Sequence, residues 1–226
     1  MGTIGMLKSA GVGVGDEVVV PAFGNAEVAE GVLALGAVPV FADIDGATYC
    51  LDAAAVEAAV TSRTVAVVAV PRFGYLAGVR AVRQLGQRRG LLVVEHRDAE
   101  DLDPSALAQR QVQAAYLDRR LTGVRTPEPC PGHTYQRYVV RVPGNGRPDR
   151  DAFARAVRRR GVECEVPVQT PVHRLPAFRQ EVSLPETVRA ADETLTLPVG
   201  GSLSRRDLQR VVAACNALGG LLQPAF

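Results

Sequence analysis

Lysine is almost absent from this chain of 226 residues. Lys8 is the single lysine, against 25 arginines, a bias typical of a GC-rich genome. Chemistry that needs a lysine amine, such as a Schiff base to a carbonyl cofactor, therefore rests on Lys8 or does not take place in this chain.

Cysteine is also scarce and unpatterned. Cys50, Cys130, Cys164 and Cys215 lie far apart and form no C-x-x-C pair. Zinc sites and disulfide frameworks use regularly spaced cysteines, so neither is predicted, and free, partly buried thiols are expected.

Excess charge and long apolar runs are lacking as well. The formal net charge of +2 gives no electrostatic reason to expect nucleic acid as a partner. No apolar run reaches the roughly 20 residues that cross a bilayer, and the N-terminus has no signal-peptide pattern. We expect a soluble, cytoplasmic protein that binds neither nucleic acid nor a membrane.

Apolar segments alternate with helical ones in the first half of the chain, and 47% of all residues are hydrophobic. This composition excludes a disordered or fibrous protein, and the alternation is typical of βαβ units with a parallel sheet. Four strands are predicted, one after the glycine-rich turn of 11–15 and the others at 39–45, 64–71 and from residue 91. Helices are predicted at 25–35, 51–60 and 79–89.

The second half has a different pattern. Pro104 begins a predicted helix that runs to about residue 120, with Ser105 close to its cap. Tyr135–Val142 is predicted to be a strand with one wet face, because arginines alternate with apolar residues. Further predictions are helices at 150–161 and 202–218, short strands at 162–166 and 195–198, and an irregular segment at 167–185. The predicted fold class is α/β, with a parallel-sheet domain (1–103) followed by a small α+β domain (104–226).

The stretch from Leu91 to Asp103 is the first candidate site. It reads L-L-V-V-E-H-R-D-A-E-D-L-D, a buried strand that turns polar at Glu95, and α/β sheets carry their chemistry beyond the carboxyl ends of such strands. His96 and Asp98 are candidates for acid/base catalysis together with Arg97. His96 or Asp98 could also join Glu100 or Asp101 at a metal. The alternative interpretation is an acidic, solvated turn without a function.

Several segments resemble the DegT/DnrJ/StrS sugar aminotransferases, fold-type I enzymes that use pyridoxal phosphate (PLP). These segments are G-V-G-V-G-D-E-V-V-V-P-A-F, L-A-L-G-A-V-P-V-F-A-D-I-D, R-D-A-F-A-R-A-V-R-R-R-G-V and P-V-H-R-L-P-A-F, in the family's order. The resemblance implies an aminotransferase-like large domain, here truncated, and a small C-terminal domain. It also implies that His173 and Arg174, in P-V-H-R, lie in a loop that faces the substrate.

The departures from the family concern its cofactor. Where the family reads V-I-E-D-A-A-Q, this chain has His96 in place of the aspartate that pairs with the PLP ring nitrogen, and Ala99 in place of the glutamine. Gly2-Thr3 resembles the phosphate-binding S-G-T but lies about three residues too near the G-D-E-V segment. Most of the family's first helix is expected to be missing. After Asp103 the segment with the Schiff-base lysine and the dimer-forming helices is missing too.

These departures predict that PLP is not a cofactor, and two classes of function follow. In the first, the chain has been repurposed for a PLP-independent reaction or for ligand binding in amino-sugar or related natural-product biosynthesis. In this case a small-molecule metabolite binds near His96, Arg97 and Asp98. In the second, it is a non-catalytic partner of a full-length aminotransferase, in a heterodimer or a homodimer, since apolar surface would be exposed where the missing segments packed. Conventional aminotransferase activity and a non-functional fragment are the remaining alternatives.

Overall fold

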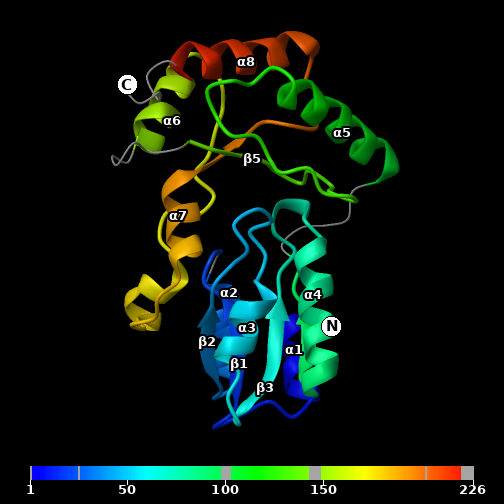
Figure 1. Ribbon diagram of the computed structural model, residues 1–226, viewed down its shortest axis with the longest axis vertical. Coiled ribbons are helices and arrows are strands. Elements are labelled where there is room, and N and C mark those ends of the chain that lie inside the picture. Colours follow the sequence, from blue (N-terminus) through cyan, green and yellow to red (C-terminus); the bar gives the residue numbers. More distant parts are fainter. Residues whose placement is uncertain (1, 25, 98–102, 143–148, 202, 220–226) are drawn as a thin grey trace. The chain divides into compact units, whose positions relative to one another are not determined.

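The computed structural model describes residues 2–24, 26–97, 103–142, 149–201 and 203–219, and the chain divides into two compact units (Figure 1). The sheet unit comprises residues 1–100 and 170–189, and the small unit comprises 101–169 and 190–226. The predicted boundary at 103/104 therefore differs from this division in two respects: the first unit ends at residue 100, and a later segment belongs to it. Residues 170–189 leave the small unit and pack with the N-terminal sheet.

Four parallel strands form the sheet in the order β2-β1-β3-β4. Their bounds are β1 Glu17–Pro21, β2 Val38–Ala42, β3 Thr64–Ala69 and β4 Leu92–Glu95. The central strands β1 and β3 are nearly continuous apolar runs, as strands covered on both faces require. The predicted α/β class with a parallel sheet is confirmed.

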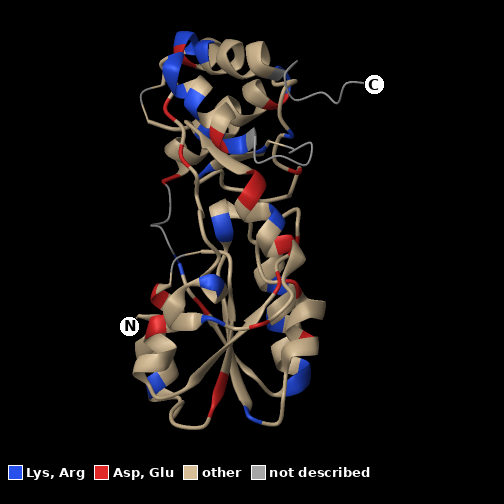
Figure 2. Ribbon diagram, turned by 90° about the vertical axis from the view of Figure 1, so that its left-hand side faces the viewer, with Lys and Arg blue, Asp and Glu red and all other residues tan. Residues whose placement is uncertain are grey.

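Helices cover both faces of this sheet (Figure 2). They are α1 Thr3–Ser9, α2 Glu27–Ala34, α3 Ala53–Ala59 and α4 Ala77–Arg89. Because side chains alternate along a strand, Val18 and Val20 belong to the core with α1 and α2, whereas Val19 packs with α3 and α4. Gly36 and Gly90 follow α2 and α4 with positive φ, the left-handed ending that glycine adopts at little cost.

Asp43, directly after β2, ties the segment 170–189 to the sheet. Its Oδ2 accepts from the backbone N–H of Glu186 (3.0 Å), and its Oδ1 accepts from the N–H and the hydroxyl of Thr187 (2.8 and 2.7 Å). These donors lie in the first turn of α7 (Pro185–Glu193), so Asp43 acts as a cap supplied by a distant part of the chain. The backbone N–H of Val172 also donates to the carbonyl of Ala22.

The small unit is built on the antiparallel pair β5 (Tyr138–Arg141) and β6 (Thr194–Leu197). Its helices are α5 Pro104–Asp118, α6 Asp149–Arg159 and α8 Arg205–Gly219. Leu117, Tyr138 and Leu195 are fully buried members of its core. At the start of α8, Ser204 and Asp207 form a capping box: the Asp207 carboxylate accepts from the N–H of Ser204, and Asp207 N–H donates to the Ser204 hydroxyl.

Several predicted elements differ from the observed ones. Short helices at 3–9 and 185–193 were not predicted, and 3₁₀ turns occur at Val172–Arg174 and Pro176–Phe178 within the segment expected to be irregular. The predicted strand at 162–166 is a single bridge between Glu165 and Thr196. β5 is buried on both faces rather than wet on one. Asp103, not Ser105, caps α5, accepting from the N–H groups of Ser105 and Ala106.

The helices of the described residues were compared with the length and apolar character of a membrane-spanning helix. Among the described residues, no helix combines the length and the apolar character that crossing a bilayer requires.

Replacing Asp43 tests whether it holds the returning segment. Asp43→Ala removes four hydrogen bonds, three of them to α7 and one to the backbone N–H of Ile44, and leaves donors of α7 unsatisfied. We therefore expect the free energy of unfolding to fall by about 2 kcal/mol. Urea unfolding followed by circular dichroism measures this loss. Asp192→Asn is the matched control, because Asp192 is exposed on the same helix, and its effect should stay within about 0.5 kcal/mol. Equal effects of the two substitutions would contradict the capping role.

Candidate functional site

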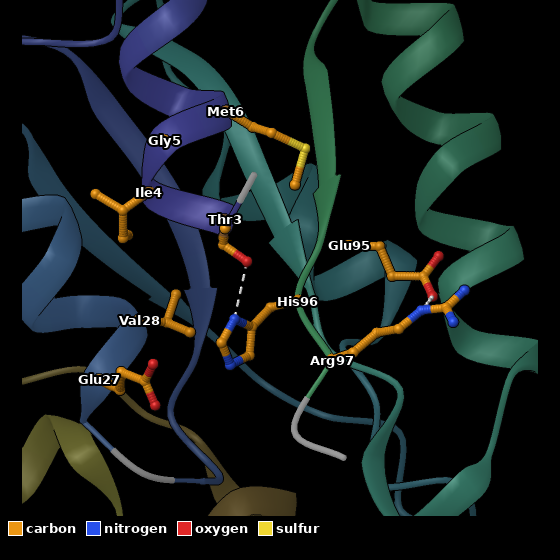
Figure 3. Close-up of a pocket in the computed structure, with 10 residues that line it drawn as sticks. Thr3, Ile4, Gly5, Met6, Glu27, Val28, Glu95, His96 and Arg97 are labelled. Carbon is orange, nitrogen blue, oxygen red and sulfur yellow. Dashed lines mark hydrogen bonds and ion pairs between the residues drawn. The ribbon is translucent and has the colours of Figure 1, made fainter. Parts of the chain in front are cut away.

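A pocket of about 500 Å³ opens at the carboxyl end of β4, which is within the size range of ligand sites (Figure 3). Its walls come from the first turns of α1 and α2, from the last residue of β4, and from the two residues that follow β4. The lining residues are Gly2, Thr3, Ile4, Gly5, Met6, Glu27, Val28, Glu95, His96 and Arg97.

His96 is fixed at the end of β4 by its backbone and by its side chain. Its N–H donates to the carbonyl of Ala69 (2.9 Å), which extends the pairing of β4 with β3 by one residue. Its Nδ1 lies 2.9 Å from Oγ1 of Thr3, the first residue of α1 (Figure 3). This hydrogen bond joins residues 93 positions apart and brings the start of the chain into the site.

The charges beside His96 are largely paired. Glu95 accepts from Nε of Arg97 (3.2 Å) and from Nη2 of Arg83 (3.0 Å). Both arginine side chains are more than half exposed, so these ion pairs hold the Glu95 carboxylate in place and contribute little to stability. Arg97 therefore lines the pocket as part of an ion-pair group. Glu27 adds a second carboxylate from α2.

The structure brings together only some of the predicted site residues. His96 and Arg97 line one pocket, whereas Asp98, Glu100 and Asp101 lie outside the described residues. His173 and Arg174 are not among the residues lining this pocket. His173 is 4% exposed, packs against Phe41 and faces the core of the sheet unit, and this burial, with Arg174 beside it, lowers its pKa.

Thr3 and Glu27 are site residues that the sequence did not reveal. The Gly2-Thr3 pair resembles the family's S-G-T, but its spacing from G-D-E-V is about three residues shorter than the family motif allows. In the structure, α1 has seven residues and places Thr3 beside His96 at the end of β4. Glu27 has no sequence signal, since an acid in the first turn of a helix is ordinary.

The described residues do not gather a set of metal-ligating side chains. Among the described residues there is no group of three or more histidine, cysteine, aspartate or glutamate side chains placed to hold a metal ion. Lys8 is exposed in the last turn of α1, and the pocket lining includes residues 2–6 of that segment but not Lys8.

Comparison with known proteins identifies the class. The family model described as DegT/DnrJ/EryC1/StrS aminotransferase matches residues 3–101 and 100–216. The chain belongs to this aminotransferase family.

Curated relatives match a limited stretch. L-glutamine:scyllo-inosose aminotransferase of Streptomyces griseus is 46% identical over 89 residues, which are 39% of this chain and 21% of that protein. A pleiotropic regulatory protein of Geobacillus stearothermophilus is 45% identical over 89 residues, again 39% of this chain, and 24% of its own length. The matched stretch thus spans about a fifth to a quarter of these relatives.

Solved structures match over almost the whole chain. The aminotransferase TlmJ from Streptoalloteichus hindustanus superposes with a TM-score of 0.86 at 25% identity, covering 98% of this chain and 84% of that one. A DegT DnrJ EryC1 StrS aminotransferase from Brucella abortus gives a TM-score of 0.85 at 18% identity, covering 96% and 83%. The aminotransferase fold is common to all three chains.

Proposed function

We propose that this chain binds a small polar metabolite of amino-sugar or aminocyclitol biosynthesis in the pocket at the end of β4, without lysine-bound PLP. The observation that carries the proposal is the hydrogen bond between Thr3 and His96, which builds a fixed imidazole into the wall of a ligand-sized pocket. Catalysis by this imidazole would be PLP-independent.

The donor set of the pocket supports the absence of PLP, because it does not fit that cofactor. Family members hold PLP through a lysine and balance its ring nitrogen with an aspartate. In this chain His96 takes the aspartate's position, and a neutral imidazole supplies no negative charge. Lys8, the single lysine, is outside the residues that line the pocket. No step of the proposed function therefore passes through PLP.

The residues present can perform simpler chemistry. An imidazole exchanges protons near neutral pH, and it can also hydrogen-bond a ligand oxygen without transferring a proton. The Glu95–Arg97 pair and Glu27 offer polar contacts, while Ile4, Met6 and Val28 provide apolar surface. This mixture suits a compact polyhydroxy compound that has both polar and apolar faces.

The names of the relatives narrow the class of metabolite. Several are described as aminotransferases for scyllo-inosose or 2-deoxy-scyllo-inosose, and one acts on a UDP-linked 3-dehydro sugar. Cyclic keto-polyols, their amines and nucleotide-linked sugars are therefore the first compounds to test.

Replacing His96 tests the proposal. A panel of scyllo-inosose, scyllo-inosamine and UDP-N-acetylglucosamine is added to the protein, and thermal unfolding is recorded. A ligand at about 100 times its Kd adds about 2.7 kcal/mol, which corresponds to a Tm rise of about 5–10 °C for a chain of this size. We expect at least one compound to give such a rise, and His96→Ala to abolish it.

Lys8→Ala is the control for this experiment, because Lys8 lies on α1 but does not line the pocket. It should keep the ligand-induced rise in Tm. Absence of a shift with every compound, or a shift that survives His96→Ala, would contradict the proposed site.

The edge of the sheet favours a second candidate function, that of a partner subunit. β4 ends the four-stranded sheet, and Leu92 on this strand is 37% exposed. In the family a further segment follows this strand, so an intact aminotransferase homologue or a second copy of this chain could pack against the same edge.

Light scattering after size exclusion tests the partner function. We expect the mass of a dimer, either for this chain alone or for its mixture with the Streptomyces griseus aminotransferase, and loss of that dimer with Leu92→Glu. Val14→Glu is the control, because Val14 is 92% exposed in the turn before β1. A monomer at every concentration, alone and in the mixture, would exclude this function.

A further inference from the structure

His96 has two ring nitrogens, and which of them carries the proton decides what the pocket offers to a ligand. We infer that Thr3 is a positioning residue whose hydroxyl donates to Nδ1 of His96, so that the neutral ring holds its proton on Nε2. The role of this tautomer in binding a ligand rests on the proposed function. The tautomer itself is a property of the protein without ligand.

The contact is specific in its geometry. Thr3 Oγ1 lies 2.9 Å from Nδ1, a normal hydrogen-bond length, and Thr3 is 9% exposed. Its position is set from two sides, because α1 packs against β4 and the fully buried Leu7 of the same helix lies in the core of the sheet unit. Thr3 is therefore held beside the imidazole by the fold and not by the contact alone.

Hydrogen-bond satisfaction favours one direction of this bond. A threonine hydroxyl has one hydrogen, and within the described part of the chain the only side-chain or backbone group it bonds is Nδ1 of His96. If Nδ1 carried the proton and donated to Oγ1, the hydroxyl hydrogen would have no acceptor among the described protein groups, which is less favourable at a side chain that is 9% exposed. Donation from Thr3 to Nδ1 satisfies both groups.

The far side of the ring is compatible with the same tautomer. Figure 3 shows the second ring nitrogen on the side away from Thr3, toward the wall that Glu27 and Val28 form. A carboxylate accepts hydrogen bonds and does not donate them, so the carboxylate that Glu27 adds to this wall is compatible with a proton on Nε2.

This tautomer limits the chemistry of the pocket. In this tautomer the neutral His96 has its N–H donor at Nε2, and its basic lone pair at Nδ1 accepts from Thr3. The group that fits is an oxygen acceptor, and a carbonyl so bonded is polarised without proton transfer. His96 therefore serves as a hydrogen-bond donor to a ligand oxygen and not as the base that its position at a strand end first suggests.

Nitrogen NMR measures the tautomer directly. The three histidines of this chain are ¹⁵N-labelled, and long-range proton–nitrogen correlations are recorded near pH 7, with His96→Gln to assign the signals. His133 is an internal standard: the backbone N–H of Tyr135 can only donate, and it lies 2.9 Å from His133 Nδ1, so His133 must carry its proton on Nε2. Burial lowers the pKa of His133 to about 4, so this standard is neutral.

We expect His96 to give the pattern of His133, with the Nε2–H form in excess by about tenfold, the ratio that one net hydrogen bond supplies. Thr3→Val keeps the shape of the side chain but removes the donor, so the two tautomers should come within about threefold of each other. Thr3→Ser should restore the excess. Ser9→Ala, on the same helix with its hydroxyl bonded to the carbonyl of Met6, should change nothing.

A wild-type His96 with its proton on Nδ1, or an unchanged ratio in Thr3→Val, would overturn the inference. Unchanged His133 and His173 signals in Thr3→Val confirm that the variant is folded, and the Thr3→Ser rescue separates the hydroxyl from a packing effect. The experiment needs no ligand, so a failed ligand screen leaves this result intact and the two failures remain distinguishable.

Discussion

Burial of the parallel strands on both faces is the constraint on which the rest of the sheet unit depends. After their first residues, Glu17 and Thr64, β1 and β3 are apolar because helices cover them from both sides, and such strands leave little room for polar groups along their length. Polar side chains therefore appear only where strands end. Asp43 follows β2 and caps α7, while His96 follows β4 and lines the pocket. The same edge serves both structure and site.

The Thr3–His96 hydrogen bond gives this edge its particular character. By the resemblance to the aminotransferase family, His96 stands in place of an aspartate that pairs with the PLP ring nitrogen, and Thr3 resembles the threonine of the phosphate-binding S-G-T. In this chain the two positions hold an imidazole and a hydroxyl that bond each other. A hydrogen-bonded pair of this kind can bind an oxygen of a ligand, but it provides neither the negative charge nor the amine that PLP chemistry needs.

The alternation of apolar runs with helical segments was enough to predict the parallel sheet and most of its helices. The same pattern could not show that residues 170–189 return to the sheet, because their anchor is a carboxylate more than 140 positions away, Asp43. It also missed α1, whose seven residues are too few for a periodic signal. Tertiary contacts, not local preference, stabilise both segments.

The sequence predicts only part of the candidate site, because tertiary contacts bring the other part to it. His96 and Arg97 stand directly after an apolar strand, which is a position readable from one segment. Thr3 and Glu27 come from other elements, and only the fold shows that they share a pocket with His96. His173 is not among the residues that line this pocket: its ring is buried beside Phe41, and its place in a substrate-facing loop stays a prediction.

Titration with PLP tests the central claim most directly. Increasing PLP is added to the wild-type chain and to Lys8→Arg, absorbance is scanned for an imine band, and borohydride followed by peptide mapping locates any covalent product. We predict identical spectra for the two proteins, with no band that saturates at one equivalent. A band that saturates at one equivalent, is fixed to Lys8 by borohydride and disappears in Lys8→Arg would contradict a PLP-independent pocket.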